Sequence, residues 1–158
     1  MSDLGENNLL EQELDEDTAK DLFLIFETDK EEYALDVENV IEIIPLVGIT
    51  YVPHVSEYIK GIINLRGDIV PVISVRARFQ KPKIEYDDAS CIVVIRHGEF
   101  TLGLITDAVR GTMTIREEQI SAPPSARLSY SNLFVKSIGQ TDNGIKLLLD
   151  LEKVIFEV

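Results

Sequence analysis

The chain has 158 residues, a length that predicts one compact unit or two very small ones. Its 28 acidic and 15 basic residues give a net charge of −13, while 45% of the residues are hydrophobic. This combination indicates a globular protein with an acidic surface. Because binding to nucleic acid and to anionic membrane surfaces depends on basic side chains, we expect neither to be a partner.

The amino terminus, the apolar runs and the cysteine content predict a cytoplasmic protein. No apolar run approaches the roughly 20 residues of a membrane span, and the first residues lack the basic start and apolar stretch of a signal peptide. The single cysteine, Cys91, cannot form an internal disulfide, which suits a reducing compartment.

Residues 1–20 form a separate acidic segment, with seven acidic residues against one lysine. Such a segment buries too little apolar surface to offset the entropy of ordering it, so we predict a solvated tail. The alternative is a partner-binding helix built on Leu9, Leu10 and Leu14. We expect the folded domain to run from residue 21 to residue 158.

The folded region begins with a predicted hairpin. The continuous apolar run at residues 22–26 is typical of a strand that is buried on both faces. A turn at residues 29–31 leads into a returning strand at 33–37. The spacing of the apolar residues from 37 to 44 then predicts a turn of helix that ends before Pro45.

A second hairpin is predicted from β-branched residues at 61–65 and 69–75, around the turn Arg66-Gly67-Asp68. Pro71 lies inside its second arm, and since proline has no amide hydrogen we expect an edge strand or a bulge there. The apolar pattern is lost at residues 80–89, which are interpreted as a linker.

The second half of the chain repeats this order of elements. Residues 90–95 and 100–105 predict a hairpin with a turn at 97–99, and residues 135–138 and 145–151 predict another. The repeat indicates two similar β units of about 60 residues each, which favours small barrels over one open sheet. We expect the first barrel at about 33–80 and the second at about 88–151.

The residue types that catalysis and metal binding require are scarce. His54 lies in a predicted loop and His97 in a predicted turn, and no Cys and His cluster has zinc-site spacing. Cys91 lies in an apolar strand and is interpreted as a core residue. Asp36 and Asp107 take equivalent places in the repeat, which indicates capping; the enzymatic alternative is acid–base hydrolysis by this pair. We expect no catalytic residue, metal or cofactor.

The aliphatic residues on these short strands are more numerous than two small barrels would bury, so part of them is expected to face a partner. The alternative is that all of them belong to the core.

The segment from Tyr58 to Val72, Tyr-Ile-Lys-Gly-Ile-Ile-Asn-Leu-Arg-Gly-Asp-Ile-Val-Pro-Val, closely resembles the central motif of the CheW family, the scaffold proteins of bacterial chemotaxis. Flanking matches lie at residues 33–44, 102–109 and 147–153. The resemblance runs from about residue 21 to the carboxyl terminus. The same domain occurs fused to other modules in the kinase CheA and the adaptor CheV; this chain has no room for them, so we expect a stand-alone CheW.

The resemblance implies an all-β fold of two packed, five-stranded, SH3-like β-barrels with short helical turns. It also implies a non-catalytic adaptor that couples the cytoplasmic tips of methyl-accepting chemoreceptors to the histidine kinase CheA. Family members form rings with the kinase through barrel-to-barrel contacts, and the receptor tip, a helical hairpin, lies in an apolar groove between the barrels. The expected location is the cytoplasm, at membrane-associated receptor arrays.

Carried over residue by residue, the resemblance places the receptor groove at aliphatic positions with two polar residues at its side. The expected groove residues are Leu24, Val37, Val40, Ile43, Asn64, Arg66 and Val109. Arg66 is expected to pair with Glu42, either to hold a hairpin loop or to position the groove edge. A kinase-facing surface is expected on the first barrel, near Ile49, Val52 and Pro71.

The chain departs from the family pattern at Ser74, where many members have an aspartate, so a contact made by that aspartate is in question. This departure and the acidic tail motivate an alternative function, a modulatory adaptor that competes for receptor or kinase without activating the kinase.

Overall fold

The computed structural model describes residues 20–46, 48–123 and 133–156. Apart from Lys20, the segment predicted as an acidic tail lies outside the described residues. The strands are β1 (Leu22–Thr28), β2 (Glu31–Asp36), β3 (Val40–Pro45), β4 (Ile59–Leu65), β5 (Asp68–Ser74), β6 (Cys91–His97), β7 (Phe100–Thr106), β8 (Ala108–Thr114), β9 (Ile120–Ser121), β10 (Val135–Thr141) and β11 (Gly144–Leu149). The helices are short: η1 (Val37–Asn39), α2 (Val75–Arg78), η2 (Glu117–Gln119) and α3 (Leu151–Phe156).

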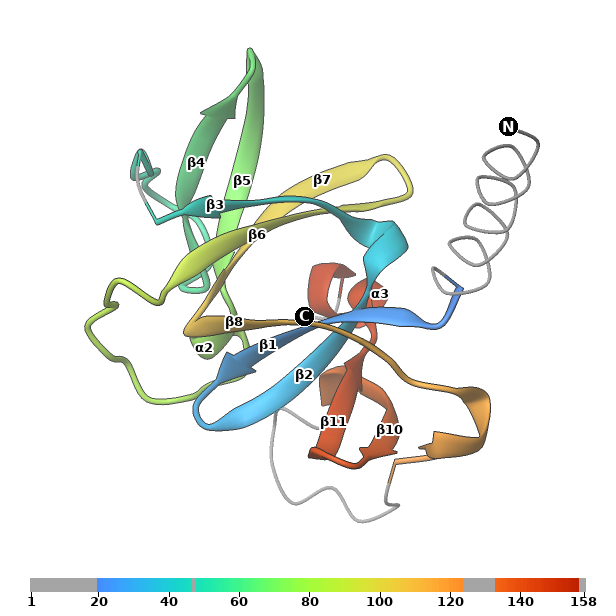
Figure 1. The fold of residues 1–158 in the computed structure, drawn as a ribbon. Helices are drawn as coiled ribbons and strands as arrows, with labels where there is room; N and C mark the ends of the chain where they lie inside the picture. The colour runs from blue at the N-terminus through green and yellow to red at the C-terminus, as the bar shows by residue number, and fades with distance from the viewer. Residues whose placement is uncertain (1–19, 47, 124–132, 157–158) are drawn as a thin grey trace, which may run out of the picture.

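The strands form two sheets, in the orders β8-β1-β2-β11-β10-β9 and β3-β6-β7-β5-β4. The first five strands of the longer sheet have the same topology as the shorter sheet, and β9 is added at the end. In each sheet one parallel pairing, β2 with β11 or β7 with β5, joins two antiparallel parts. We call the first sheet the terminal barrel and the second the central barrel. The hairpins β4–β5 and β10–β11 lie at opposite ends of the molecule (Figure 1). The predicted all-β fold with short helical turns is confirmed.

The curling of each sheet follows from its short connections. After β3 the chain reaches the far edge of the central barrel almost at once, because Thr50 pairs with Ile62 of β4. In the terminal barrel, η2 leads from the edge strand β8 to β9, which pairs with β10. A sheet whose two edges are joined by so few residues must curl on itself.

The predicted division of the chain into barrels at 33–80 and 88–151 is wrong. The hairpin β1–β2 belongs with β8 to β11, and the hairpin β6–β7 belongs with β3 to β5. The repeat itself is present, but each barrel takes its hairpin from one repeat and its other strands from the other. The physical reason is that η1 alone separates β2 from β3 and Asp107 alone separates β7 from β8, so the chain runs straight on into the other sheet.

The buried apolar residues form three clusters. Each barrel has its own core, and a third and larger cluster lies between the sheets. Alternate residues of β1 serve two of them: Phe23 and Ile25 fill the terminal barrel, whereas Leu24 and Phe26 pack in the cluster between the sheets. The prediction that residues 22–26 are buried on both faces is therefore confirmed. We call the third cluster the central core.

Two local predictions need correction. The helical turn predicted for residues 37–44 is limited to η1, because from Val40 onward the chain pairs with β6 as a strand. Pro71 does not lie on an edge strand, since β5 is flanked by β4 and β7. Proline is accommodated because the pairing of β5 with β7 begins only at Val72, so no ladder hydrogen bond needs its missing amide.

Substitution of Gly61 tests the closure of the central barrel. Gly61 has a φ of +153°, and a Cβ atom there would lie 2.1 Å from the carbonyl oxygen of Thr50. We expect Gly61→Ala to lower the free energy of unfolding by about 3 kcal/mol, measured by urea denaturation. Gly98→Ala, at a turn with no atom within 4 Å of the added Cβ, is the control and should cost about 1 kcal/mol. Equal losses in the two variants would contradict the close approach at Thr50.

Candidate partner-binding groove

Three of the predicted groove residues converge on the central core. Leu24 of β1 is buried in it, and Val40 and Val109 are half-buried against it. Val40 begins β3, the edge strand of the central barrel, and pairs with Ile95; Val109 lies in β8, the edge strand of the terminal barrel, and pairs with Phe26. The structure therefore brings together aliphatic side chains from the edges of both barrels.

The other aliphatic groove residues lie on or before β3. Val37 is half-buried in η1, next to the start of β3. Ile43 is 45% exposed and Ile41, which the sequence analysis missed, is 40% exposed. Their spacing of two residues in an apolar strand is the signal that could have identified Ile41 as an outward-facing residue.

Arg66 and Glu42 form the expected ion pair. Arg66 Nη2 donates a hydrogen bond of 3.1 Å to Glu42 Oε2, and Nη1 lies 3.0 Å from Oε1. The two residues come from the β4–β5 turn and from β3, at opposite edges of the sheet, so the pair spans the seam of the central barrel. The Arg66 side chain is 74% exposed and remains open to a partner.

The turn that carries Arg66 has its own support. Arg66 and Gly67 both have positive φ angles, 53° and 90°, as a two-residue hairpin turn requires. Asn64 Oδ1 accepts a hydrogen bond of 2.9 Å from the Gly67 amide. The Asn64 side chain therefore stabilises the turn, and its predicted place at the groove stays a prediction.

The residues predicted to face the kinase all belong to the central barrel but differ in exposure. Ile49 and Val52 are half-buried, and Ile49 packs against the core of this barrel. Pro71 is exposed on β5, and Ile69, two residues before it and therefore on the same face, is 62% exposed. The outer face of β5 is thus the apolar part of this surface.

An open hollow of about 460 Å³, which the sequence analysis missed, lies at one end of the central barrel. Ile41, Ile69 and Phe100 line it together with the charged residues Arg66, Asp68, Arg96 and Glu99. These residues come from four different strands and two turns, so no local sequence pattern marks the site.

The matching end of the terminal barrel has a smaller open hollow, of about 230 Å³, whose lining includes ion-paired side chains. Ile41 and Arg110 are the unpaired residues of equivalent bulges in β3 and β8, and Arg110 pairs with Glu27. Lys146 is buried and pairs with Glu32. Exposed apolar side chains in the one hollow and ion-paired Glu32, Arg110 and Lys146 in the other give the two barrels different surfaces in spite of their shared topology.

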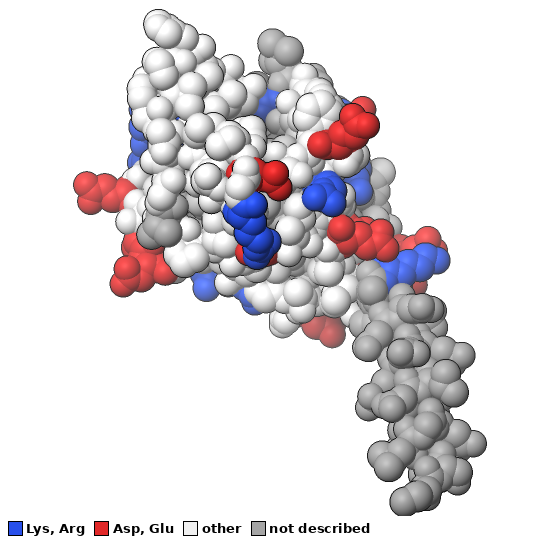
Figure 2. Space-filling view, turned by 90° about the horizontal axis from the view of Figure 1, so that it is seen from above, with Lys and Arg blue, Asp and Glu red and all other residues white. Residues whose placement is uncertain are grey.

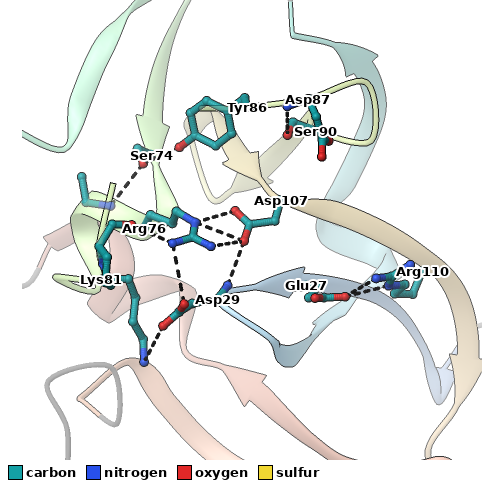
Figure 3. A network of polar contacts seen from close by, with 12 residues as sticks. Glu27, Asp29, Ser74, Arg76, Lys81, Tyr86, Asp87, Ser90, Asp107 and Arg110 are labelled. Atoms are coloured by element: carbon teal, nitrogen blue, oxygen red, sulfur yellow. Dashed lines mark hydrogen bonds and ion pairs between the residues drawn. The ribbon is translucent and has the colours of Figure 1, made fainter. Parts of the chain in front are cut away.

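A polar cluster joins the two barrels at the crossing from β7 to β8 (Figure 3). Arg76 of α2 forms a two-pronged ion pair with Asp107, through Nε to Oδ1 at 2.8 Å and Nη2 to Oδ2 at 2.7 Å. Asp107 Oδ2 also accepts the amide of Asp29 in the β1–β2 turn at 2.9 Å. The hydrogen bond to Asp107 raises the pKa of Arg76, so the guanidinium stays charged although its side chain is only 10% exposed.

Ser74, where the chain departs from the family pattern, lies in the same region and caps the helix that carries Arg76. Its hydroxyl accepts the amide of Ala77 and so caps α2, a role that an aspartate can also perform. It also lies 3.0 Å from the hydroxyl of Tyr86, whose pKa is raised by burial. Ser74 therefore keeps the cap and adds a contact to the linker at Tyr86.

The carboxylates considered for hydrolysis do not converge. Glu31 and Phe100 are the first residues of the returning strands in the two equivalent hairpins. Counted from these residues, Asp36 corresponds to Ile105, so the expected equivalence of Asp36 with Asp107 is wrong. Asp36 pairs with Phe23 in β1, whereas the Asp107 amide bonds to the Glu27 carbonyl four residues further along, about 13 Å away at strand spacing. Asp107 is also held by Arg76. No acid–base pair is formed by these two residues.

Charge and composition of the described surface agree with a protein partner. On the face shown in Figure 2, acidic and basic side chains lie in small mixed groups separated by broad uncharged areas, with no basic stripe. Within residues 20–46, 48–123 and 133–156, no group of three or more His, Cys, Asp and Glu could hold a metal ion. None of the described helices is long and apolar enough to span a bilayer.

Comparison with known proteins gives a consistent family. The family model of a CheW-like domain matches residues 22–157. The chain is 30% identical over 139 residues to the chemotaxis protein CheW of Klebsiella aerogenes, covering 88% of this chain and 84% of that protein. It is 31% identical over 138 residues to CheW of Thermotoga maritima, covering 85% and 87%.

A solved structure supports the same assignment. The scaffolding protein TtCheW from Thermoanaerobacter tengcongensis superposes with a TM-score of 0.81 at 36% identity, covering 87% of this chain and 93% of that chain. Together with the family match over most of the residues, this similarity identifies both the fold and the class of function. The chain therefore belongs to the CheW family of chemotaxis adaptor proteins.

Proposed function

We propose that the protein couples methyl-accepting chemoreceptors to the histidine kinase CheA, without catalysing a reaction itself. The observation that carries the proposal is the convergence of Val40 and Val109, from the edge strands of two different barrels, on one central core. Aliphatic residues gathered at the edges of two adjoining barrels suit the apolar side of a helical hairpin. The proposed location is the cytoplasm, where the receptor tips and the kinase lie.

The receptor tip would lie along the aliphatic residues between the barrels, with Glu42 and Arg66 at one side of the groove. The exposed guanidinium of Arg66 can donate to polar groups of the hairpin while Glu42 holds it in place. Apolar contacts supply most of the affinity in this arrangement, and the ion pair gives the hairpin its orientation.

The kinase would contact the central barrel. The proposal keeps Ile49, Val52 and Pro71 as kinase-facing residues, and the exposed Ile69 extends their apolar surface on β5. Since the two proposed surfaces lie on different strands, one copy of the protein could bind receptor and kinase at the same time. Simultaneous binding is the property that an adaptor needs.

Reconstitution tests the coupling role directly. Purified protein added to receptor-containing membranes and CheA should sediment with the membranes and raise the rate of CheA autophosphorylation. Omitting the receptors is the control, and it should abolish the increase. Sedimentation with unchanged kinase activity would overturn the coupling role, and sedimentation with lowered activity would instead favour the modulatory adaptor.

Charged substitutions at Val40 and Val109 test the groove. Val40→Asp and Val109→Asp should each weaken receptor binding at least about tenfold, because an unpaired carboxylate would enter an apolar contact. The measurement is the affinity for receptor-containing membranes, with circular dichroism to confirm folding. Ile84→Asp, at an exposed isoleucine of the linker, is the matched control and should keep the affinity. Unchanged affinity in both groove variants would contradict the assignment.

Removal of Arg66 separates its structural role from its binding role. Because its side chain is 74% exposed, Arg66→Ala should change the free energy of unfolding by less than about 1 kcal/mol in urea denaturation. If the guanidinium contacts the receptor hairpin, the loss of receptor-binding free energy in the same variant should be larger than its loss of unfolding free energy. A large loss of stability with unchanged binding would show that Arg66 only holds the barrel seam.

A further inference from the structure

The start of β8 is fixed by a single residue. Asp107 is the whole connection between β7 and β8, and Val109, a groove residue, follows two positions later. The Asp107 amide donates to the Glu27 carbonyl at 3.0 Å, and its carboxylate binds Arg76 and the amide of Asp29. Movement of this carboxylate would therefore move the first residues of β8.

Arg76 holds that carboxylate in one orientation. Its Nε and Nη2 donate to the two oxygens of Asp107, and Nη1 donates to the Pro82 carbonyl at 2.6 Å and lies 3.7 Å from Asp29 Oδ1. The side chains of Arg76 and Asp107 are only 10% and 15% exposed, so water competes little for these bonds. A lysine would keep the charge but could not bridge both oxygens and the carbonyl in a fixed plane.

The other crossing between the barrels provides an internal comparison. There η1 leads from β2 into β3 and to Val40, the counterpart of Val109. By strand register the counterparts of Asp107 and Arg76 are Glu38 and Glu152, both exposed, and among the described residues neither forms an ion pair.

Among the described residues, that second crossing is held by hydrogen bonds without an ion pair. Asp36 Oδ1 accepts the amide of Glu38 at 3.0 Å. Asn39 Nδ2 donates to the Arg96 carbonyl at 2.9 Å, and a cavity of about 120 Å³ lies beside it, lined by residues that include Asp36, His97 and Asp150. The chain thus passes between the barrels without a buried ion pair at one crossing. The topology does not require the pair at the other.

We propose that Arg76 is a positioning residue for the receptor groove: through Asp107 it fixes the start of β8 and holds Val109 where the receptor hairpin binds. The inference rests on the proposed function, because it takes Val109 as a receptor contact. The ion pair of Arg76 with Asp107 would act on the Val109 side of the groove only. Val40, on the other side, follows the crossing at η1, which has no such pair among the described residues.

Two substitutions and one control test the inference. Asp107→Asn removes the charge that Arg76 binds, and Arg76→Lys keeps a charge but loses the two-pronged contact. Glu27→Gln is the matched control, because it also replaces a carboxylate with an amide in an ion pair, here the exposed pair with Arg110 next to Val109. The free proteins are compared first, by the methyl NMR resonances of Val109 and Val40.

We expect the Val109 methyl resonances to shift or broaden in Asp107→Asn and Arg76→Lys while those of Val40 stay in place. Receptor affinity should fall about tenfold in these variants, a typical size for indirect coupling, and CheA affinity should stay within about twofold. Glu27→Gln should keep both affinities. If the role of the ion pair were purely structural, its loss would lower the melting temperature. It would then affect the resonances of Val109 and Val40 alike, and the affinities for receptor and CheA alike.

Unchanged Val109 resonances in a folded Asp107→Asn or Arg76→Lys protein would overturn the inference, whatever the binding data. If Asp107→Asn fails to fold, Arg76→Lys provides the test, since it keeps the buried charge neutralised. Displaced Val109 resonances together with full receptor affinity in Val109→Asp would support the positioning by Arg76 but overturn the proposed groove, so the two failures are distinguishable.

Discussion

The structure depends on the shortness of the two connections that cross between the barrels. Three residues separate β2 from β3, and one residue separates β7 from β8. The one-residue connection is shorter than the two-residue turns of the hairpins, and the three residues of the other connection form η1 instead of a hairpin turn. Each repeat therefore gives its first hairpin to the other repeat's strands. The central core is a direct consequence, because β1 and β6 must cover both their own barrel and the face between the barrels. Val40 and Val109, the proposed binding residues on the two edge strands, therefore share one apolar support.

Shared topology does not give the two barrels the same chemistry. Their bulges fall at matching positions, which places Ile41 and Arg110 in equivalent surroundings. In the terminal barrel, paired charges such as Glu32 with Lys146 line the hollow at the barrel end. The central barrel instead has the exposed apolar side chains of Ile41, Ile69 and Phe100 around its hollow. The central barrel consequently offers more exposed apolar surface to protein partners, even though the whole chain is strongly acidic.

An ion pair with little exposure lies where the chain has least freedom. Arg76 and Asp107 lie at the one-residue crossing, and each polar atom of the pair has a partner from the linker, the β1–β2 turn or the other member. A buried ion pair of this kind adds little net stability when compared with apolar packing, but it accepts only one geometry. A fixed geometry matters here because the next strand carries a residue of the proposed groove.

The sequence by itself determined the four hairpins, the internal repeat, the turn at Arg66-Gly67 and the family, because these depend on local periodicity, turn chemistry and a contiguous motif. It also identified Glu42 and Arg66 as partners through the resemblance. It did not identify β3 or β8, the strands that follow the two crossings. Only the tertiary structure decided which hairpin belongs to which barrel, since strand exchange leaves every local pattern unchanged. The hollow at Ile41 and Phe100 and the pairing of Arg76 with Asp107 likewise depend on residues far apart in the chain, which periodicity and spacing cannot bring together.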